Sequence, residues 1–183
     1  MKTPYKISAI FLLLFLTFSC TKEVDFDQID DVDIHTSYLV TLVYFNLEAP
    51  DFLTSQNIEE PVQADVIQAS FANVSQKYVE KVKLTILTNN EFNRDFNVEI
   101  IFFDIDQNPI YQLDPILIPA NSTELTTVIE IPSQDIPVVF NTAYYGFIIA
   151  LSASSDGSVL QPDDVYSLEF KSSLELFFNY KNI

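Results

Sequence analysis

Acidic side chains are the most numerous groups in this chain that could do chemistry. The 183 residues include 26 Asp and Glu against 9 Lys and Arg, with one Cys, one His and two Gly. Two carboxylates on either side of a glycosidic bond can hydrolyse it. No pair stands out by its spacing, and among 26 acids a chance pairing is expected. The carboxylates alone therefore predict no hydrolase.

Other catalytic residue types are too scarce for the common enzyme classes. Gly146 and Gly157 are the only glycines, so no Gly-rich phosphate loop or dinucleotide fingerprint can be present. His35 is the only histidine, and it lies in an acidic stretch near the N-terminus. A Ser-His-Asp triad would require that stretch to fold into a domain. We therefore expect no catalytic residue, no cofactor and no enzyme activity.

One pattern resembles part of a metal site. Asp104, Asp106 and Asn108 match the opening of a calcium loop, which also needs Gly at its sixth position and Glu at its twelfth. These positions hold Pro109 and Pro115. Because the turn residue and the bidentate ligand are both missing, the pattern favours a hairpin turn. We expect no metal site.

Cys20 has the clearest chemical role. Residues 1–19 hold two lysines followed by an apolar run of 12 residues, which is typical of a secretory signal and too short to span a bilayer. As the only cysteine, Cys20 has no disulfide partner in the chain. Its place after this run and after Ser19 resembles the lipobox of bacterial lipoproteins, which implies cleavage before Cys20 and attachment of fatty acyl chains to it. Thr17 and Phe18 depart from the usual lipobox, and an ordinary signal peptide is the alternative.

An acidic stretch follows the signal. Residues 20–35 hold six acids and one lysine, a composition typical of a solvated tether. Lys22, Glu23, Asp25 and Asp27 also resemble the signal that exports Bacteroidota lipoproteins to the cell surface. We therefore expect a lipid-anchored outer-membrane protein displayed on the cell surface, with the periplasmic face of the membrane as the alternative.

The net charge excludes two kinds of partner. Without residues 1–19 the chain has 7 basic and 26 acidic groups, or −19. Nucleic-acid binding depends on Lys and Arg that neutralise phosphates. Attachment to anionic headgroups needs clusters of the same residues. We expect no nucleic-acid partner, and attachment to the membrane through lipid alone.

Residues 36–183 have the pattern of one all-β domain. Alternating or continuous apolar runs lie between Pro, Asn and Asp turns and predict strands over 38–47, 81–86, 96–105, 110–113, 125–131, 143–153 and 167–183. Residues 51–60 indicate a loop, and residues 65–80 an edge strand or a short helix. Strands that are apolar on both faces suit a core between two sheets. We expect an antiparallel β-sandwich of the immunoglobulin-like type.

Phe177 is the candidate interface residue. The last expected strand places six large apolar side chains on one face, and Phe177 interrupts the polar opposite face. Aromatic residues exposed in this way commonly anchor protein interfaces.

The order of these features resembles small outer-membrane lipoproteins of the Flavobacteriia type. The resemblance rests on residues 19–27, on 83–86 leading to Asn89, and on 93–98 and 102–104. It implies a sandwich domain that serves as a non-catalytic accessory subunit of an outer-membrane β-barrel machine for barrel assembly, import or secretion. Two alternatives are a surface module that binds sugar or calcium, and a fimbrial or adhesin-type subunit that donates its C-terminal strand.

Overall fold

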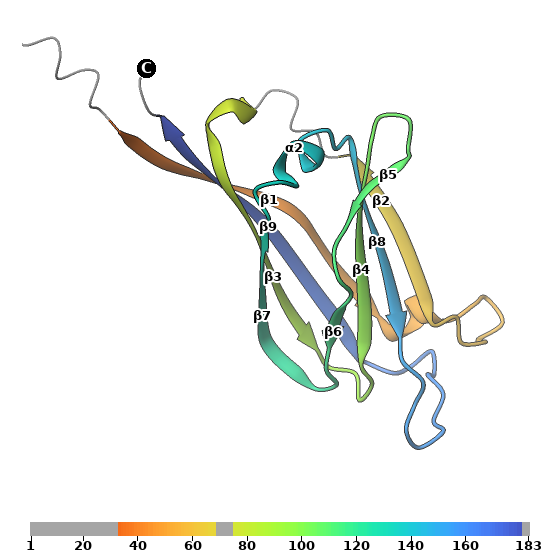
Figure 1. Cartoon of the computed structure of the whole chain (residues 1–183). Coiled ribbons are helices and arrows are strands. Elements are labelled where there is room, and N and C mark those ends of the chain that lie inside the picture. The colour runs from red at the N-terminus through yellow and green to blue at the C-terminus, as the bar shows by residue number, and fades with distance from the viewer. Residues whose placement is uncertain (1–32, 69–74, 181–183) are drawn as a thin grey trace, which may run out of the picture. The chain divides into compact units, whose positions relative to one another are not determined.

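The computed structural model describes residues 33–68 and 75–180, and residues 34–180 form one compact unit (Figure 1). The expected signal peptide, Cys20 and the export-signal residues lie outside the described part. The strands are β1 (Ile34–Glu48), β2 (Val62–Gln68), β3 (Val79–Asn90), β4 (Phe96–Phe103), β5 (Pro109–Gln112), β6 (Ile116–Ile118), β7 (Ser122–Ile131), β8 (Tyr144–Leu151) and β9 (Ser167–Tyr180). The short helices are η2 (Ala49–Phe52), η3 (Gln76–Tyr78) and α2 (Ile136–Val139).

The strands form two antiparallel sheets that face each other (Figure 1). One sheet has the order β1-β9-β3-β7, and the other has the order β2-β8-β4-β5, with β6 also paired to β4. The first half of the chain therefore pairs with the second half in reverse: β1 with β9, β2 with β8, β3 with β7, and β4 with β5 and β6. A long hairpin rolled up in this way is a double-sheet jelly roll.

The expected all-β sandwich is confirmed, but its strand order is not that of an immunoglobulin domain. In the immunoglobulin order the first two strands are neighbours in one sheet. Here successive strands from β1 to β4 alternate between the two sheets, and so do β7, β8 and β9. Hydrophobic alternation shows which residues face the core. It does not show which strands are neighbours. For this reason the expected immunoglobulin-like strand order was wrong, although the sandwich itself was predicted.

Most strands lie where the sequence predicts them, with differences at the start and in the middle. β1 begins at Ile34, two residues before the expected domain start, so His35 lies on a strand, opposite Asn179. For residues 65–80 the sequence predicted an edge strand or a short helix. The structure has both there: the end of the edge strand β2, which stops at Gln68, and the short helix η3 (Gln76–Tyr78). The three-residue β6 was not expected.

Aromatic rings and branched aliphatic side chains fill the space between the sheets. Phe92 and Phe96 lie with ring centroids 5.1 Å apart at one end of the sandwich, and Phe52 packs against both. Tyr144 and Tyr145 lie at the start of β8, and Tyr145 is buried in the core. Alternate residues of β9 are buried, as its pattern predicts.

A buried ion pair ties three loops together at the same end of the strands. Arg94 donates from Nη1 and Nη2 to the two carboxylate oxygens of Glu59, over 2.9 and 2.7 Å, and from Nε to the carbonyl of Ser152, over 2.6 Å. The backbone N–H of Leu160 also donates to Glu59, over 3.2 Å. The hydrogen bonds from Arg94 hold the pKa of Glu59 below its ordinary value. Loops 53–60, 91–95 and 152–160 are thereby linked.

Candidate binding site

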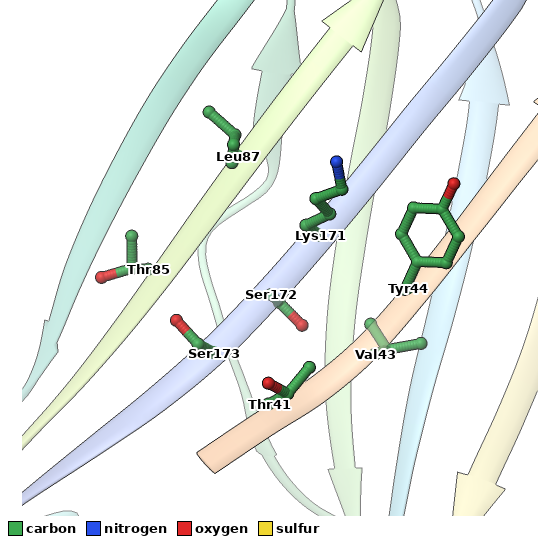
Figure 2. A pocket seen from close by; sticks show the side chains of 8 residues that line it. All are labelled: Thr41, Val43, Tyr44, Thr85, Leu87, Lys171, Ser172 and Ser173. Atoms are coloured by element: carbon green, nitrogen blue, oxygen red, sulfur yellow. The ribbon is translucent and has the colours of Figure 1, made fainter. Parts of the chain in front are cut away.

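A row of short hydroxyl side chains crosses the outer face of the first sheet. In the register, Thr41 of β1 is opposite Ser173 of β9, and Ser173 is opposite Thr85 of β3. Facing residues of an antiparallel pair point to the same side of the sheet, so the three hydroxyl-bearing residues stand side by side (Figure 2). Their side chains form the floor of a depression.

Longer side chains flank this hydroxyl row. On one side the next row holds Tyr44, Lys171 and Leu87, again opposite one another on β1, β9 and β3 (Figure 2). On the other side the next row holds Leu39, Glu175 and Lys83. We call the depression over the hydroxyl row the trough; it has a volume of about 460 Å³.

A β-bulge in β1 brings the aromatic wall to this face. The register of β1 against β9 shifts between Thr41 and Val43. Without an extra residue, positions 41 and 44 would point to opposite faces, since side chains alternate along a strand. The bulge places Thr41 and Tyr44 on the same face, one as floor and the other as wall.

The charges around the trough are paired. Lys171 lies 2.8 Å from Glu169, Lys83 lies 2.6 Å from Glu175, and Lys81 lies 2.6 Å from Glu130. Hydrogen bonds from Lys171 and Lys83 lower the pKa of Glu169 and of Glu175. The bond to Glu169 in turn raises the pKa of Lys171. This face is therefore close to neutral, although the chain as a whole carries −17.

A second hollow lies at the open side of the sandwich, between the edge strands β1 and β2. This groove has a volume of about 350 Å³ and is mostly apolar. Phe45 and Leu47 of β1 and Ile67 of β2 line it, together with Phe147 and Ile149 of the neighbouring β8. Asp65 of β2 adds the one charge to its lining.

The edge strand β1 beside this groove exposes large apolar side chains. Leu39 is 71% exposed, and Ile34, Tyr38, Val40 and Tyr44 are between 44% and 59% exposed. β1 is the end strand of its sheet, so one side of its backbone faces away from β9.

Phe177 lies on the charged outer face, as the alternation predicts, but it is half-buried. β9 is a central strand between β1 and β3, so neighbours flank Phe177 on both sides. The ammonium groups of Lys81 and Lys83 lie 5.6 and 5.4 Å from the centre of its ring. Phe177 is thus less available for an interface than the sequence pattern suggests, and its role as an anchor stays a prediction.

Asp104 is the centre of a hairpin turn between β4 and β5. One of its carboxylate oxygens accepts hydrogen bonds from the backbone N–H groups of Asn108 and Asp106, over 2.8 and 2.9 Å. The bond from Asn108 is the main reason why the pKa of Asp104 is lowered. The turn interpretation of this segment is confirmed. Among residues 33–68 and 75–180, no three His, Cys, Asp or Glu side chains are grouped so as to hold a metal ion.

The trough could not be found from the sequence. Thr41, Thr85 and Ser173 belong to no common motif, and they meet because of strand order and register. The sequence also did not predict that Tyr44 faces outward, because the hydrophobic pattern of β1 does not indicate the bulge that turns it. In the described part of the chain no helix is long and apolar enough to cross a membrane.

Comparison with known proteins informs the fold alone. No family model matches the chain, and no curated protein matches it either. A presumed secreted protein of Parabacteroides distasonis has a similar structure, with a TM-score of 0.51 and 16% identity over 63% of this chain and 37% of that one. The chain thus spans little more than a third of that protein's length.

Two viral structures are also similar, but more weakly. Infectious bursal disease virus, strain Gx, gives a TM-score of 0.42 at 12% identity over 84% of this chain and 33% of that one. Desmodium yellow mottle tymovirus gives 0.35 at 10% identity over 83% of this chain and 90% of that one. What this chain shares with the Parabacteroides protein is a β-sandwich fold.

Proposed function

We propose that this chain is a lipid-anchored, non-catalytic binding domain of the bacterial outer membrane, displayed on the cell surface, and that it docks as an accessory subunit on an outer-membrane protein. The lipobox-like sequence that ends in Cys20 supports the anchor. The acids that begin at Glu23 support display at the surface. One chain segment supports the docking.

That segment is the first half of β1, and its composition is the observation that carries the proposal. Long exposed apolar edge strands invite pairing with another chain, and proteins usually protect them with charges, prolines or bulges. Residues 34–41 contain no Lys, Arg, Asp, Glu or Pro, and the bulge comes after them. The other edge strand at this opening is protected, because Asp65 points to the inner side. We infer that a strand of the partner adds to β1.

The expected anchor would hold β1 close to the membrane. Thirteen residues, 21–33, separate Cys20 from the start of β1. Fully extended, they span at most about 45 Å. A partner embedded in the same membrane can therefore reach β1.

The docking is tested by placing charge on the edge strand. Leu39→Lys and Val40→Lys put a lysine on each face of β1, and Val128→Lys is the matched control on β7, the opposite edge strand, where Val128 is 55% exposed. Tagged, lipidated chains are purified from their own membranes, and the co-purifying outer-membrane proteins are quantified. We expect the β1 variants to lose a partner that wild type and the control retain. If wild type, the two β1 variants and the Val128→Lys control all co-purify with the same partners, docking through β1 is refuted.

Surface display is tested separately. Glu23→Gln, Asp25→Asn and Asp27→Asn in one chain should move the domain to the periplasmic side without unfolding it. Added protease on intact cells then cleaves wild type and spares the variant. Equal cleavage of both chains would leave the acidic stretch as a tether with no export role.

The alternatives receive unequal support from the geometry. β9 is paired to β1 on one side and to β3 on the other, which offers no free C-terminal strand for donation. The carboxylate of Asp104 accepts hydrogen bonds within its own hairpin turn, which does not favour a calcium site there. A sugar-binding role is favoured by the trough.

A further inference from the structure

We propose that the trough on the outer face of the β1-β9-β3-β7 sheet is a binding site for a neutral oligosaccharide. The trough shares β1 with the docking edge proposed above, but its floor is formed by side chains that point outward from the sheet, whereas strand addition uses the free backbone edge of β1. The inference therefore stands independently of the docking proposal.

The trough combines three hydroxyl groups on its floor with a lining that is otherwise mostly apolar, and a sugar ring offers partners for both. Among the described residues, the hydroxyls of Thr41, Ser173 and Thr85 have no side-chain hydrogen bond to another protein group. A hydroxyl can both donate and accept, which suits the hydroxyls of a sugar. Neighbouring strands lie about 4.8 Å apart, so the row extends roughly 10 Å from Thr41 to Thr85. This is about the length of a disaccharide.

The wall supplies an aromatic ring for the apolar face of a sugar. Tyr44 is 59% exposed, and Lys171 lies 5.5 Å from the centre of its ring. Tyrosine offers an apolar ring together with a polar hydroxyl. The side chain of Leu87 adds a second apolar contact at the far end of the same row.

The electrostatics favour an uncharged ligand. The lysines of this face are engaged by Glu169, Glu175 and Glu130, so they offer no free positive charge to an anion. The surrounding chain, with its net charge of −17, repels anionic polysaccharides at long range. A neutral glycan meets neither obstacle.

Binding is measured by titration calorimetry on the mature chain in detergent. The probes are neutral hexasaccharides of the malto, cello, laminari, manno and chito series, with alginate and polygalacturonate as anionic probes. Tyr44→Ala should weaken binding of the neutral probe roughly tenfold, from loss of stacking. Tyr44→Phe should restore most of that affinity. Thr85→Val keeps the shape of the side chain and removes one hydroxyl from the floor. The affinity for the neutral probe should then fall by about the factor that corresponds to one lost hydrogen bond.

Tyr38→Ala is the matched control. Tyr38 lies on the same strand, is 57% exposed and points to the other side of the sheet, so its removal should leave the affinity for the neutral probe unchanged. Thermal unfolding confirms that each variant is folded. The proposal is overturned if no neutral oligosaccharide binds, if the anionic probes bind as well as the neutral ones, or if Tyr44→Ala and Thr85→Val bind like wild type.

Discussion

The ion pair between Arg94 and Glu59 should be the most sensitive polar contact in the domain. The side chain of Arg94 is 4% exposed and that of Glu59 is 17% exposed. Glu59→Gln would leave the guanidinium buried without its counter-charge, while the bonds to Ser152 and Leu160 hold the loops in place. Removing one partner of a buried pair costs about 3–5 kcal/mol. For a domain of about 150 residues, this corresponds to a melting temperature lower by roughly 10 °C.

The assay is urea unfolding at neutral pH, with Glu130→Gln as the matched control. The pair of Glu130 with Lys81 is exposed, with side chains 59% and 39% accessible, and such pairs contribute about 0–1 kcal/mol. A cost below about 1 kcal/mol for Glu59→Gln would show that the buried pair behaves like a surface pair. Together with the single variant Arg94→Met, the double variant Glu59→Gln with Arg94→Met separates the coupling between the two residues from their individual contributions.

The same pair predicts a pH dependence with a definite sign. The pKa of Glu59 is lowered in the folded chain from its ordinary value of 4.5. The native carboxylate therefore holds its proton less tightly than the unfolded one, and its stabilising contribution is present above pH 4.5 and is lost as the pH falls through the lowered folded value. Wild type and Glu59→Gln should accordingly converge in stability in acid. A difference that stays constant down to the lowest accessible pH would contradict this reading.

Three further outcomes are expected. Cys20→Ser should give a chain without lipid that is released from membranes; retention in the outer-membrane fraction after a high-salt wash would show that docking holds it there. EDTA should leave the melting temperature unchanged, and a loss of stability that calcium restores would show that the chain binds calcium after all. Leu176→Ala should cost about 2–5 kcal/mol because Leu176 is buried, whereas the half-buried Phe177→Ala should cost less; equal losses in urea unfolding would place Phe177 in the core.

The sequence predicts the strands well because burial leaves a period-2 pattern. β3 alternates from Lys81 onward, β7 from Leu125 onward and β9 along most of its length, and β4 is apolar on its inner face throughout. β6 has three residues, too few to show a period. β2 was ambiguous because its inner face carries Gln63 and Asp65, which weaken the apolar alternation of an edge strand.

Strand order and the binding surfaces are long-range properties, and local patterns do not encode them. The trough depends on Ser173 meeting Thr41 on one side and Thr85 on the other, over separations of more than 80 residues. The bulge in β1 that exposes Tyr44 likewise appears in the pairing with β9 and not in the residues of β1 themselves. The pattern of β9 placed Phe177 on the correct face, but its partial burial follows from the central position of that strand.

The docking of β1 on an outer-membrane protein is tested most directly by crosslinking in living cells. A photoreactive amino acid is placed at Leu39 on β1 and, as the control, at Val128 on β7, and the crosslinked products in the outer membrane are identified by mass spectrometry. We expect position 39 to give one dominant adduct with an integral outer-membrane protein, absent from position 128. Identical adducts from both positions, or none from position 39, would contradict docking through β1.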